Sequence, residues 1–143
     1  MKLLSIAGFG AILLAVVGLW EIDALLSASL LVMVVQISAA LLMIWARVTF
    51  GRRSFHVGAN PTAGGLITTG PYRIIRHPIY AAICIFVWAG ALANLSTESV
   101  SLGLLATAGA IVRVLCEERL VMQRYPEYRA YSLTTKRLLP GIW

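Results

Sequence analysis

Four long apolar runs constrain this chain more than any other feature of its sequence. They cover about residues 3–20, 24–46, 78–94 and 100–116. A helix needs about 20 apolar residues to cross the hydrocarbon core of a bilayer, and each run is close to that length. The chain is 59% hydrophobic and 13% charged, whereas soluble domains are about 25% charged. The sequence therefore predicts an all-α integral membrane bundle with about four transmembrane helices.

The segments between the runs complete the predicted layout. Residues 21–23 leave room only for a short turn, so the first two helices are expected to form an antiparallel hairpin. Residues 47–69 are too polar and too rich in glycine and proline to span, and they are expected to form a cytoplasmic connector. The fourth helix is expected to continue from Glu117 into water until Pro126, and a C-terminal helix follows. Residues 1–143 are expected to form a single domain.

The distribution of charge predicts the orientation of the bundle. In a four-span layout all 12 Lys and Arg residues lie at one end, whereas Glu21, Asp23 and Glu98 lie at the other. Loops rich in Lys and Arg stay on the cytoplasmic side, so both termini are expected in the cytoplasm, in an inner membrane or an endomembrane. Anionic lipid headgroups are the expected partners of the net charge of +6, and no nucleic-acid partner is expected.

Several residues inside the apolar runs have structural interpretations. Gln36 and Ser38 are expected to form interhelical hydrogen bonds, and Gly103 and Gly109 are expected to allow close helix packing. The two cysteines lie within apolar runs and are expected to behave as small buried hydrophobic residues. They form neither a CxxC pair nor a zinc pattern, so no metal site is expected.

The densest polar cluster lies at residues 70–80, where the third run begins. Pro78 suits the first turn of a helix, because the N–H that proline lacks has no partner there. Arg76 and His77 are therefore expected at a helix N-terminus, where free N–H groups and the dipole favour an anion. The alternative is that these basic residues are only topology signals and interfacial anchors.

A second cluster lies at the end of the fourth run. Arg113 and Glu117 are four residues apart and share a helix face, whereas Glu118 is turned by about 140° from Arg113. The two glutamates therefore cannot pair with Arg113 in the same way. An ion pair that caps the membrane end is one interpretation, and a polar cavity lined by these residues is the other. Residues 125–131 contain three tyrosines, which alone indicate an aromatic interfacial belt.

Together these clusters resemble the isoprenylcysteine carboxyl methyltransferase family and the related phospholipid N-methyltransferases. The resemblance covers about residues 64–143, which would be the cofactor-binding half. It rests on the order of five motifs: Gly-Pro-Tyr-Arg at 70–73, Arg-His-Pro-Ile-Tyr at 76–80, an arginine with two glutamates at 113–118, Tyr-x-x-Tyr at 128–131 and Lys-Arg-Leu-Leu-Pro at 136–140. The chain departs from the family at 125–126, Tyr-Pro where Phe-Gly is frequent, and at 89–91, where phospholipid methyltransferases have Gly-x-Gly.

The resemblance implies methyl transfer from S-adenosylmethionine without a Rossmann fold, and the chain lacks the strand–GxGxxG–helix context of that fold. Charge and resemblance together assign Arg76 and His77 to the cofactor carboxylate and Glu117 or Glu118 to its ammonium group. Aromatic contacts with the adenine or the sulfonium would come from three tyrosines: Tyr72, Tyr80 and Tyr128.

The acceptor is expected to be lipid-like or prenylated, with Arg113 orienting it and Glu118 as the second catalytic residue. A carboxylate acceptor is ionised at pH 7 and needs placement rather than a base. An amine would have to lose a proton, for which His77 and His56 are the candidates, although a structural or solvated role suits His56 better. Three alternatives stay open: a phospholipid amine N-methyltransferase, an NADPH-dependent membrane sterol-type reductase, and a non-enzymatic membrane scaffold or transporter.

Overall fold

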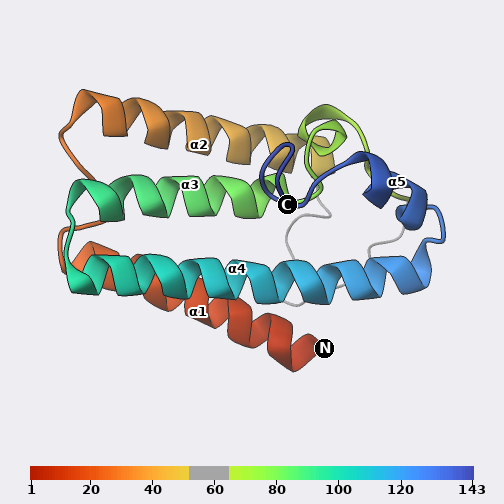
Figure 1. Ribbon diagram of the computed structural model, residues 1–143, viewed down its shortest axis with the longest axis horizontal. Coiled ribbons are helices and arrows are strands. Elements are labelled where there is room, and N and C mark those ends of the chain that lie inside the picture. Colours follow the sequence, from red (N-terminus) through yellow and green to blue (C-terminus); the bar gives the residue numbers. More distant parts are fainter. Residues whose placement is uncertain (52–64) are drawn as a thin grey trace.

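The computed structural model describes residues 1–51 and 65–143 (Figure 1). Most of the described chain is helical, in the order α1 (Lys2–Glu21), α2 (Leu30–Phe50), the 3₁₀ helix η2 (Gly70–Arg73), α3 (Pro78–Ala93), α4 (Thr97–Arg124) and α5 (Tyr128–Thr134). The predicted all-α bundle is confirmed. The middle of the predicted connector, including Arg52, Arg53 and His56, lies outside the described residues.

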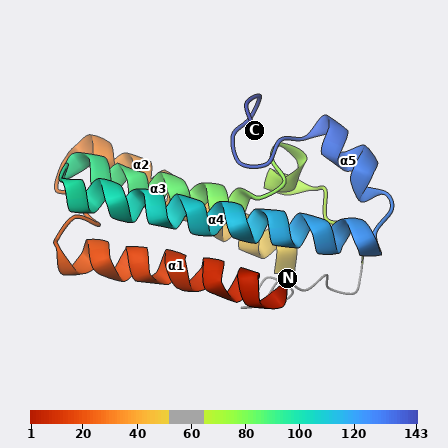
Figure 2. The ribbon, with the colours of Figure 1, turned by 60° about the horizontal axis from the view of Figure 1, so that its bottom comes forward.

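The four long helices alternate in direction along the chain, but the first of them packs against the last (Figures 1 and 2). α1 packs along α4, α4 packs along α3, and α3 packs along α2. An antiparallel hairpin with a short turn at residues 21–23 was predicted, but the connection between α1 and α2 extends over residues 22–29, and the two helices do not pack along each other. Their connection passes over the end of α3, so each of them instead packs against a helix from the second half of the chain.

Three helices, α1, α2 and α4, are long and apolar enough to cross a membrane. α3 has almost the predicted bounds but only 16 residues. At a rise of 1.5 Å per residue it is about 24 Å long, shorter than the hydrocarbon core of about 30 Å. Pro78 fixes its start and Asn94 follows its last residue. Large apolar side chains are exposed along α1 and α2, as on a lipid-facing surface.

The second helix begins at Leu30 and not at the predicted Ala24. Asp23 has a positive φ of 53° and turns the chain away from α1. The next residues are buried although they are not helical, and the Leu25 carbonyl lies so close to Gly90 of α3 that a Cβ there would be 2.1 Å from it. The sequence predicts a span for the residues after Asp23 because they are apolar, and hydropathy does not distinguish a buried connection from a helix.

The polar residues inside α2 differ in what they bond. Gln36 is buried, and its Nε2 donates to the Leu25 carbonyl at 2.7 Å and to the Phe86 carbonyl of α3 at 3.4 Å. The predicted interhelical bond is therefore confirmed for Gln36. It was wrong for Ser38, whose hydroxyl donates to the Val34 carbonyl within its own helix at 2.8 Å.

α4 is one continuous helix of 28 residues. Ser96 caps its start, with reciprocal bonds between Ser96 and Ser99 of 2.9 and 3.0 Å. The helix continues past the apolar run and ends at Arg124, two residues before Pro126, as predicted. This extension carries the two neighbouring glutamates beyond the apolar part of the helix.

Glycines allow α1 and α4 to approach closely. A Cβ on Gly109 would lie 2.6 Å from the Gly8 carbonyl oxygen, and a Cβ on Gly8 would lie 2.8 Å from the Gly109 carbonyl oxygen. Gly103 lies against the ring of Trp88 of α3. The predicted close packing at Gly103 and Gly109 is confirmed, and small residues at such crossings are typical of membrane helices.

Gly8→Ala should therefore destabilise the fold, whereas Gly10→Ala on the same helix should not. The new methyl group at position 8 meets backbone, and overpacking of this kind costs about 1–3 kcal/mol. Nothing lies within 4 Å of a Cβ at Gly10, and alanine is favoured over glycine in a helix by about 1 kcal/mol. Thermal unfolding in detergent micelles measures the difference, and equal melting temperatures would contradict the α1–α4 crossing.

Candidate functional site

The two polar clusters of the sequence meet at one end of the bundle (Figures 1 and 2). Four segments converge there: the start of α3, the extension of α4, the helix α5, and residues 135–143, which are here called the strap. Pro78 is the first residue of α3 and His77 is its N-cap, as predicted. This geometry places Arg76, His77 and Tyr80 against the side chains of Glu117 and Glu118.

Glu118 accepts more hydrogen bonds than its neighbour. Its side chain is only 3% exposed. Oε1 accepts hydrogen bonds from Arg76 Nε at 2.9 Å and from the Tyr128 hydroxyl at 3.0 Å, and Oε2 accepts one from Arg137 Nε at 2.9 Å. A buried carboxylate requires pairing and hydrogen bonding. Two guanidinium groups and a hydroxyl meet that requirement for Glu118.

Glu117 is the more accessible carboxylate, with a side chain 27% exposed. Its Oε1 accepts a hydrogen bond from the Tyr80 hydroxyl and lies 3.3 Å from Arg113 Nη2. The predicted pairing of residues four apart on one helix face is thus confirmed. Glu118, turned away from Arg113, pairs with other arginines, as its position on the helix also predicts.

His77 lies between the two carboxylates. Its Nδ1 is 3.8 Å from Glu117 Oε2, and its Nε2 is 3.4 Å from Glu118 Oε1. The ring is almost covered, with its side chain 10% exposed. The imidazole therefore connects the accessible glutamate with the buried one.

Arg113 connects the site to the first helix of the chain. Its Nε donates to the Tyr80 hydroxyl at 2.6 Å, and its Nη1 donates to the Ser5 carbonyl of α1 at 3.1 Å. Its guanidinium also lies over the rings of Phe9 and Tyr80, 5.4 and 5.7 Å from their centroids. Arg113 is therefore more than one half of an ion pair, because it also orients Tyr80 and holds α1.

The tyrosines near the site have separate positions. The Tyr72 hydroxyl donates to the Ala46 carbonyl at 3.5 Å, and its ring packs on Phe50 with centroids 5.5 Å apart. The Tyr131 hydroxyl donates a hydrogen bond to the Tyr72 carbonyl. Burial raises the pKa of Tyr131 to about 12, and burial followed by the charge of Glu118 raises the pKa of Tyr128 above its usual value. These two hydroxyls are therefore protonated donors at neutral pH.

The comparison with known proteins identifies the family of the chain. The model of the phospholipid methyltransferase family matches residues 24–128, most of the chain. The chain belongs to this family. The description of this family names a methyltransferase, and neither the reductase nor the transporter that the sequence left open.

A curated relative covers part of the chain. The nickel-cobalt-cadmium resistance protein NccN of Alcaligenes xylosoxydans xylosoxydans is 36% identical over 81 residues. The match includes 54% of this chain and 37% of that protein, so the chain spans little more than a third of its relative. No solved structure matches the chain. Within residues 1–51 and 65–143, no group of three or more His, Cys, Asp and Glu side chains could hold a metal ion.

Most of the predicted site residues lie together. Direct contacts join seven side chains: Arg76, His77, Tyr80, Arg113, Glu117, Glu118 and Tyr128. Tyr72 bonds outside this group, and its carbonyl accepts a hydrogen bond from Tyr131 of α5. Sequence reasoning missed Arg137 and the Ser5 carbonyl. The basic strap motif was a signal for Arg137, whereas no sequence pattern marks a backbone carbonyl.

Arg113→Met should lower the melting temperature more than Glu117→Gln. Removing Arg113 leaves the Ser5 carbonyl, the Tyr80 hydroxyl and the Glu117 carboxylate without this partner. Breaking a buried ion pair costs about 3–5 kcal/mol. Glu117 is partly exposed, and such pairs contribute about 1 kcal/mol or less. The double variant should remain as unstable as Arg113→Met. Equal losses in the single variants and recovery in the double would indicate a simple ion pair.

Proposed function

We propose that this protein transfers a methyl group from S-adenosylmethionine to a carboxylate on a lipid-like acceptor. The observation that carries the proposal is the cluster at the mouth of α3, where three guanidinium groups and a histidine surround two neighbouring carboxylates. Membership of a methyltransferase family supports the cofactor, and exposed apolar surfaces on α1 and α2 support a lipid-like acceptor.

The donor set fits the charges of the cofactor. When bound, S-adenosylmethionine supplies a methyl group activated by a sulfonium. Arg76 and His77 would hold its carboxylate. Arg76 Nε and Nη1 are engaged, whereas its Nη2 makes no hydrogen bond within the described chain and remains for a ligand. Tyr72, Tyr80 and Tyr128 remain the aromatic candidates for the adenine or the sulfonium.

The two glutamates would have different roles in the site. Glu117 would hold the cofactor ammonium, because its side chain is 27% exposed and its Oε2 is 3.8 Å from His77 Nδ1, beyond hydrogen-bond distance. Glu118 is 3% exposed and already accepts from two arginines and Tyr128. It would act as the internal counter-ion that keeps Arg76 and His77 in position. The guanidinium group of Arg113 contacts Tyr80, Glu117 and the Ser5 carbonyl. Arg113 would therefore position Tyr80 and Glu117.

The charge of the cluster supports an anionic acceptor. Arg76, Arg113 and Arg137 carry three positive charges against two on the glutamates, which leaves an excess of +1 with His77 neutral. A carboxylate is ionised at pH 7 and needs only placement and desolvation. A phospholipid amine is the second candidate, since the matching family is described by phospholipids. Its proton would pass to His77 or Glu117.

Glu117→Gln should weaken binding of S-adenosylhomocysteine by about ten- to a hundredfold, since a hydrogen bond to a charged group contributes about 1.5–3 kcal/mol. His77→Ala and Arg76→Ala should also weaken it. Glu127→Gln, an exposed glutamate in the segment between α4 and α5, is the matched control and should bind normally. Calorimetric titration measures the affinities. Unchanged affinity in Glu117→Gln, or binding of NADPH instead, would refute the cofactor assignment.

Labelled methyl transfer to a total membrane extract should give a lipid or peptide whose label is released by mild alkali. A methyl ester loses its methyl group under those conditions, whereas an N-methyl amine keeps it. Alkali-stable label on a phospholipid amine would replace the carboxylate with the second candidate. Absence of any transfer in the wild type, with transfer by a positive-control enzyme, would count against the reaction.

We also propose that the site end of the bundle is cytoplasmic. All basic residues of the described chain lie at or near that end, whereas Glu21, Asp23 and Glu98 lie near the opposite connections. The N-terminus and the segment that follows α4 share the site end, so both termini would be cytoplasmic (Figure 1). A reporter inserted at residues 94–96 should read as external, and a cytoplasmic reading would reverse the orientation.

A further inference from the structure

The strap, residues 135–143, is attached to the start of α3 by main-chain bonds. The Arg76 N–H donates to the Lys136 carbonyl at 2.7 Å, and the His77 N–H donates to the Arg137 carbonyl at 2.9 Å. Ile75 and Lys136 form a parallel bridge. The N–H groups of the two residues that directly precede α3 thus donate hydrogen bonds to the strap.

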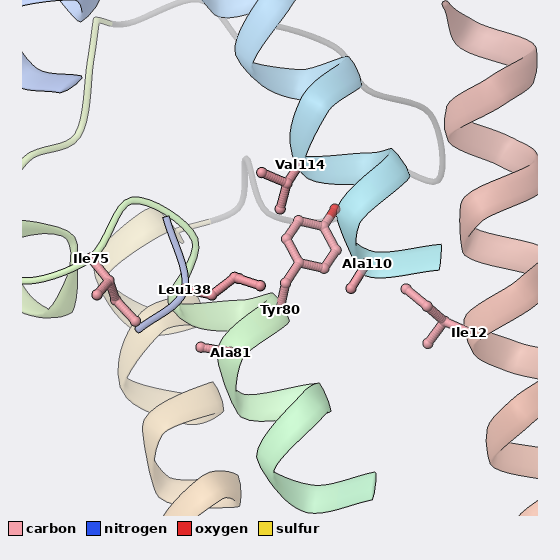
Figure 3. Packing of buried hydrophobic residues seen from close by; sticks show 7 residues of the cluster. All are labelled: Ile12, Ile75, Tyr80, Ala81, Ala110, Val114 and Leu138. Carbon is pink, nitrogen blue, oxygen red and sulfur yellow. The ribbon is translucent and has the colours of Figure 1, made fainter. Parts of the chain in front are cut away.

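The strap is folded back on itself and has one apolar anchor. The N–H groups of Leu138 and Leu139 donate to the Trp143 carbonyl at 2.9 and 3.3 Å. Leu138 is 9% exposed and lies in a cluster with Ile75, Tyr80 and Ala81 (Figure 3). Leu139 is exposed. The attachment therefore depends on a single buried leucine and on polar contacts.

The strap and the end of α5 together hold the side chain of Arg76. Arg76 Nη1 donates to the Thr135 carbonyl of the strap and, at 3.0 Å, to the Ser132 carbonyl of α5. With its N–H on the Lys136 carbonyl, Arg76 is bound to the strap through its main chain and its side chain. The direction in which its remaining Nη2 points therefore depends on the strap.

Arg137 is the polar contact that joins the strap to α4. Its Nε donates to Glu118 Oε2 at 2.9 Å, while Arg76 Nε donates to Oε1 of the same carboxylate at the same distance. The Arg137 guanidinium lies 5.0 Å from the centroid of the Trp143 ring. Glu118 is thus clamped between an arginine that precedes α3 and an arginine of the strap.

We propose that the strap completes the cofactor site, and that Arg137 is a positioning residue that acts through Glu118 on Arg76 and His77. The strap lies beyond residues 24–128, which the family match covers. Without Arg137, the buried carboxylate loses one of its two arginines, and the Thr135 and Lys136 carbonyls, which accept from Arg76, are released with the strap. The inference rests on the proposed function only where it concerns the cofactor.

The test uses the full chain in detergent micelles and five variants, one of which is the single variant Glu118→Gln. Arg137→Gln removes the charge, and Arg137→Lys keeps it within reach of Glu118. Arg129→Gln, at an exposed arginine of α5, is the control with the same change in charge. The double variant Arg137→Gln/Glu118→Gln leaves no uncompensated carboxylate, so it provides a folded reference if Arg137→Gln alone unfolds.

The first arm needs no ligand. Hydrogen–deuterium exchange of the amides of Arg76 and His77 should be at least tenfold faster in Arg137→Gln than in the wild type. Arg129→Gln should exchange like the wild type, and Arg137→Lys should lie near it. Unchanged exchange in Arg137→Gln would show that Arg137 does not hold the strap and would overturn the proposal.

The second arm measures the affinity for S-adenosylhomocysteine. Arg137→Gln should bind about tenfold more weakly, Arg137→Lys should restore most of the affinity, and the double variant should bind no more weakly than the weaker of the two single variants. A lower melting temperature with unchanged affinity, or losses that add, would overturn the positioning role. If the wild type does not bind the probe, the proposed function fails, while the exchange arm still decides whether Arg137 holds the strap.

Discussion

The arrangement of the site depends on one buried charge, the carboxylate of Glu118. A carboxylate removed from water destabilises a fold unless cations and donors surround it. No single helix can supply them, because neighbours on α4 point in other directions. The partners come from the segment before α3, from α5 and from the strap: Arg76, Tyr128 and Arg137. Burial of this one group therefore brings three separate segments to the end of α4.

Close packing within the bundle gives this cluster a rigid support. α4 lies between α1 and α3, and Gly8 and Gly109 bring the backbones of α1 and α4 together. That approach places the Ser5 carbonyl within 3.1 Å of Arg113. Arg113 in turn fixes the Tyr80 hydroxyl and the more accessible Glu117. A contact between small residues within the bundle is thus connected, through one arginine, to the carboxylate that is most accessible to a ligand.

The sequence predicts the helices and most site residues, but not their neighbours. Apolar runs locate α1, α3 and α4 because hydropathy is a property of the segment itself, and the spacing of Arg113 and Glu117 is fixed by the helix. The start of α2 and the pairing of α1 with α4 depend on backbone contacts at Gly90 and Gly109. Such contacts leave no mark on hydropathy. The role of Arg137 was equally hidden, since it depends on where the strap returns.

The position of the cluster explains how one end of a small bundle can serve an amphiphile. The apolar sides of α1 and α2 face outward, and the polar groups gather where the apolar part of α4 gives way to its polar extension. In the function proposed above, a lipid-like acceptor would keep its chain in the bilayer while its polar end meets the arginines. The excess positive charge would then lie where the charged group of the proposed acceptor arrives, beside a Glu117 that is accessible and a Glu118 that is not. Two adjacent glutamates of equal chemistry thus differ in exposure, because a step of about 100° around the helix leaves the first accessible and buries the second.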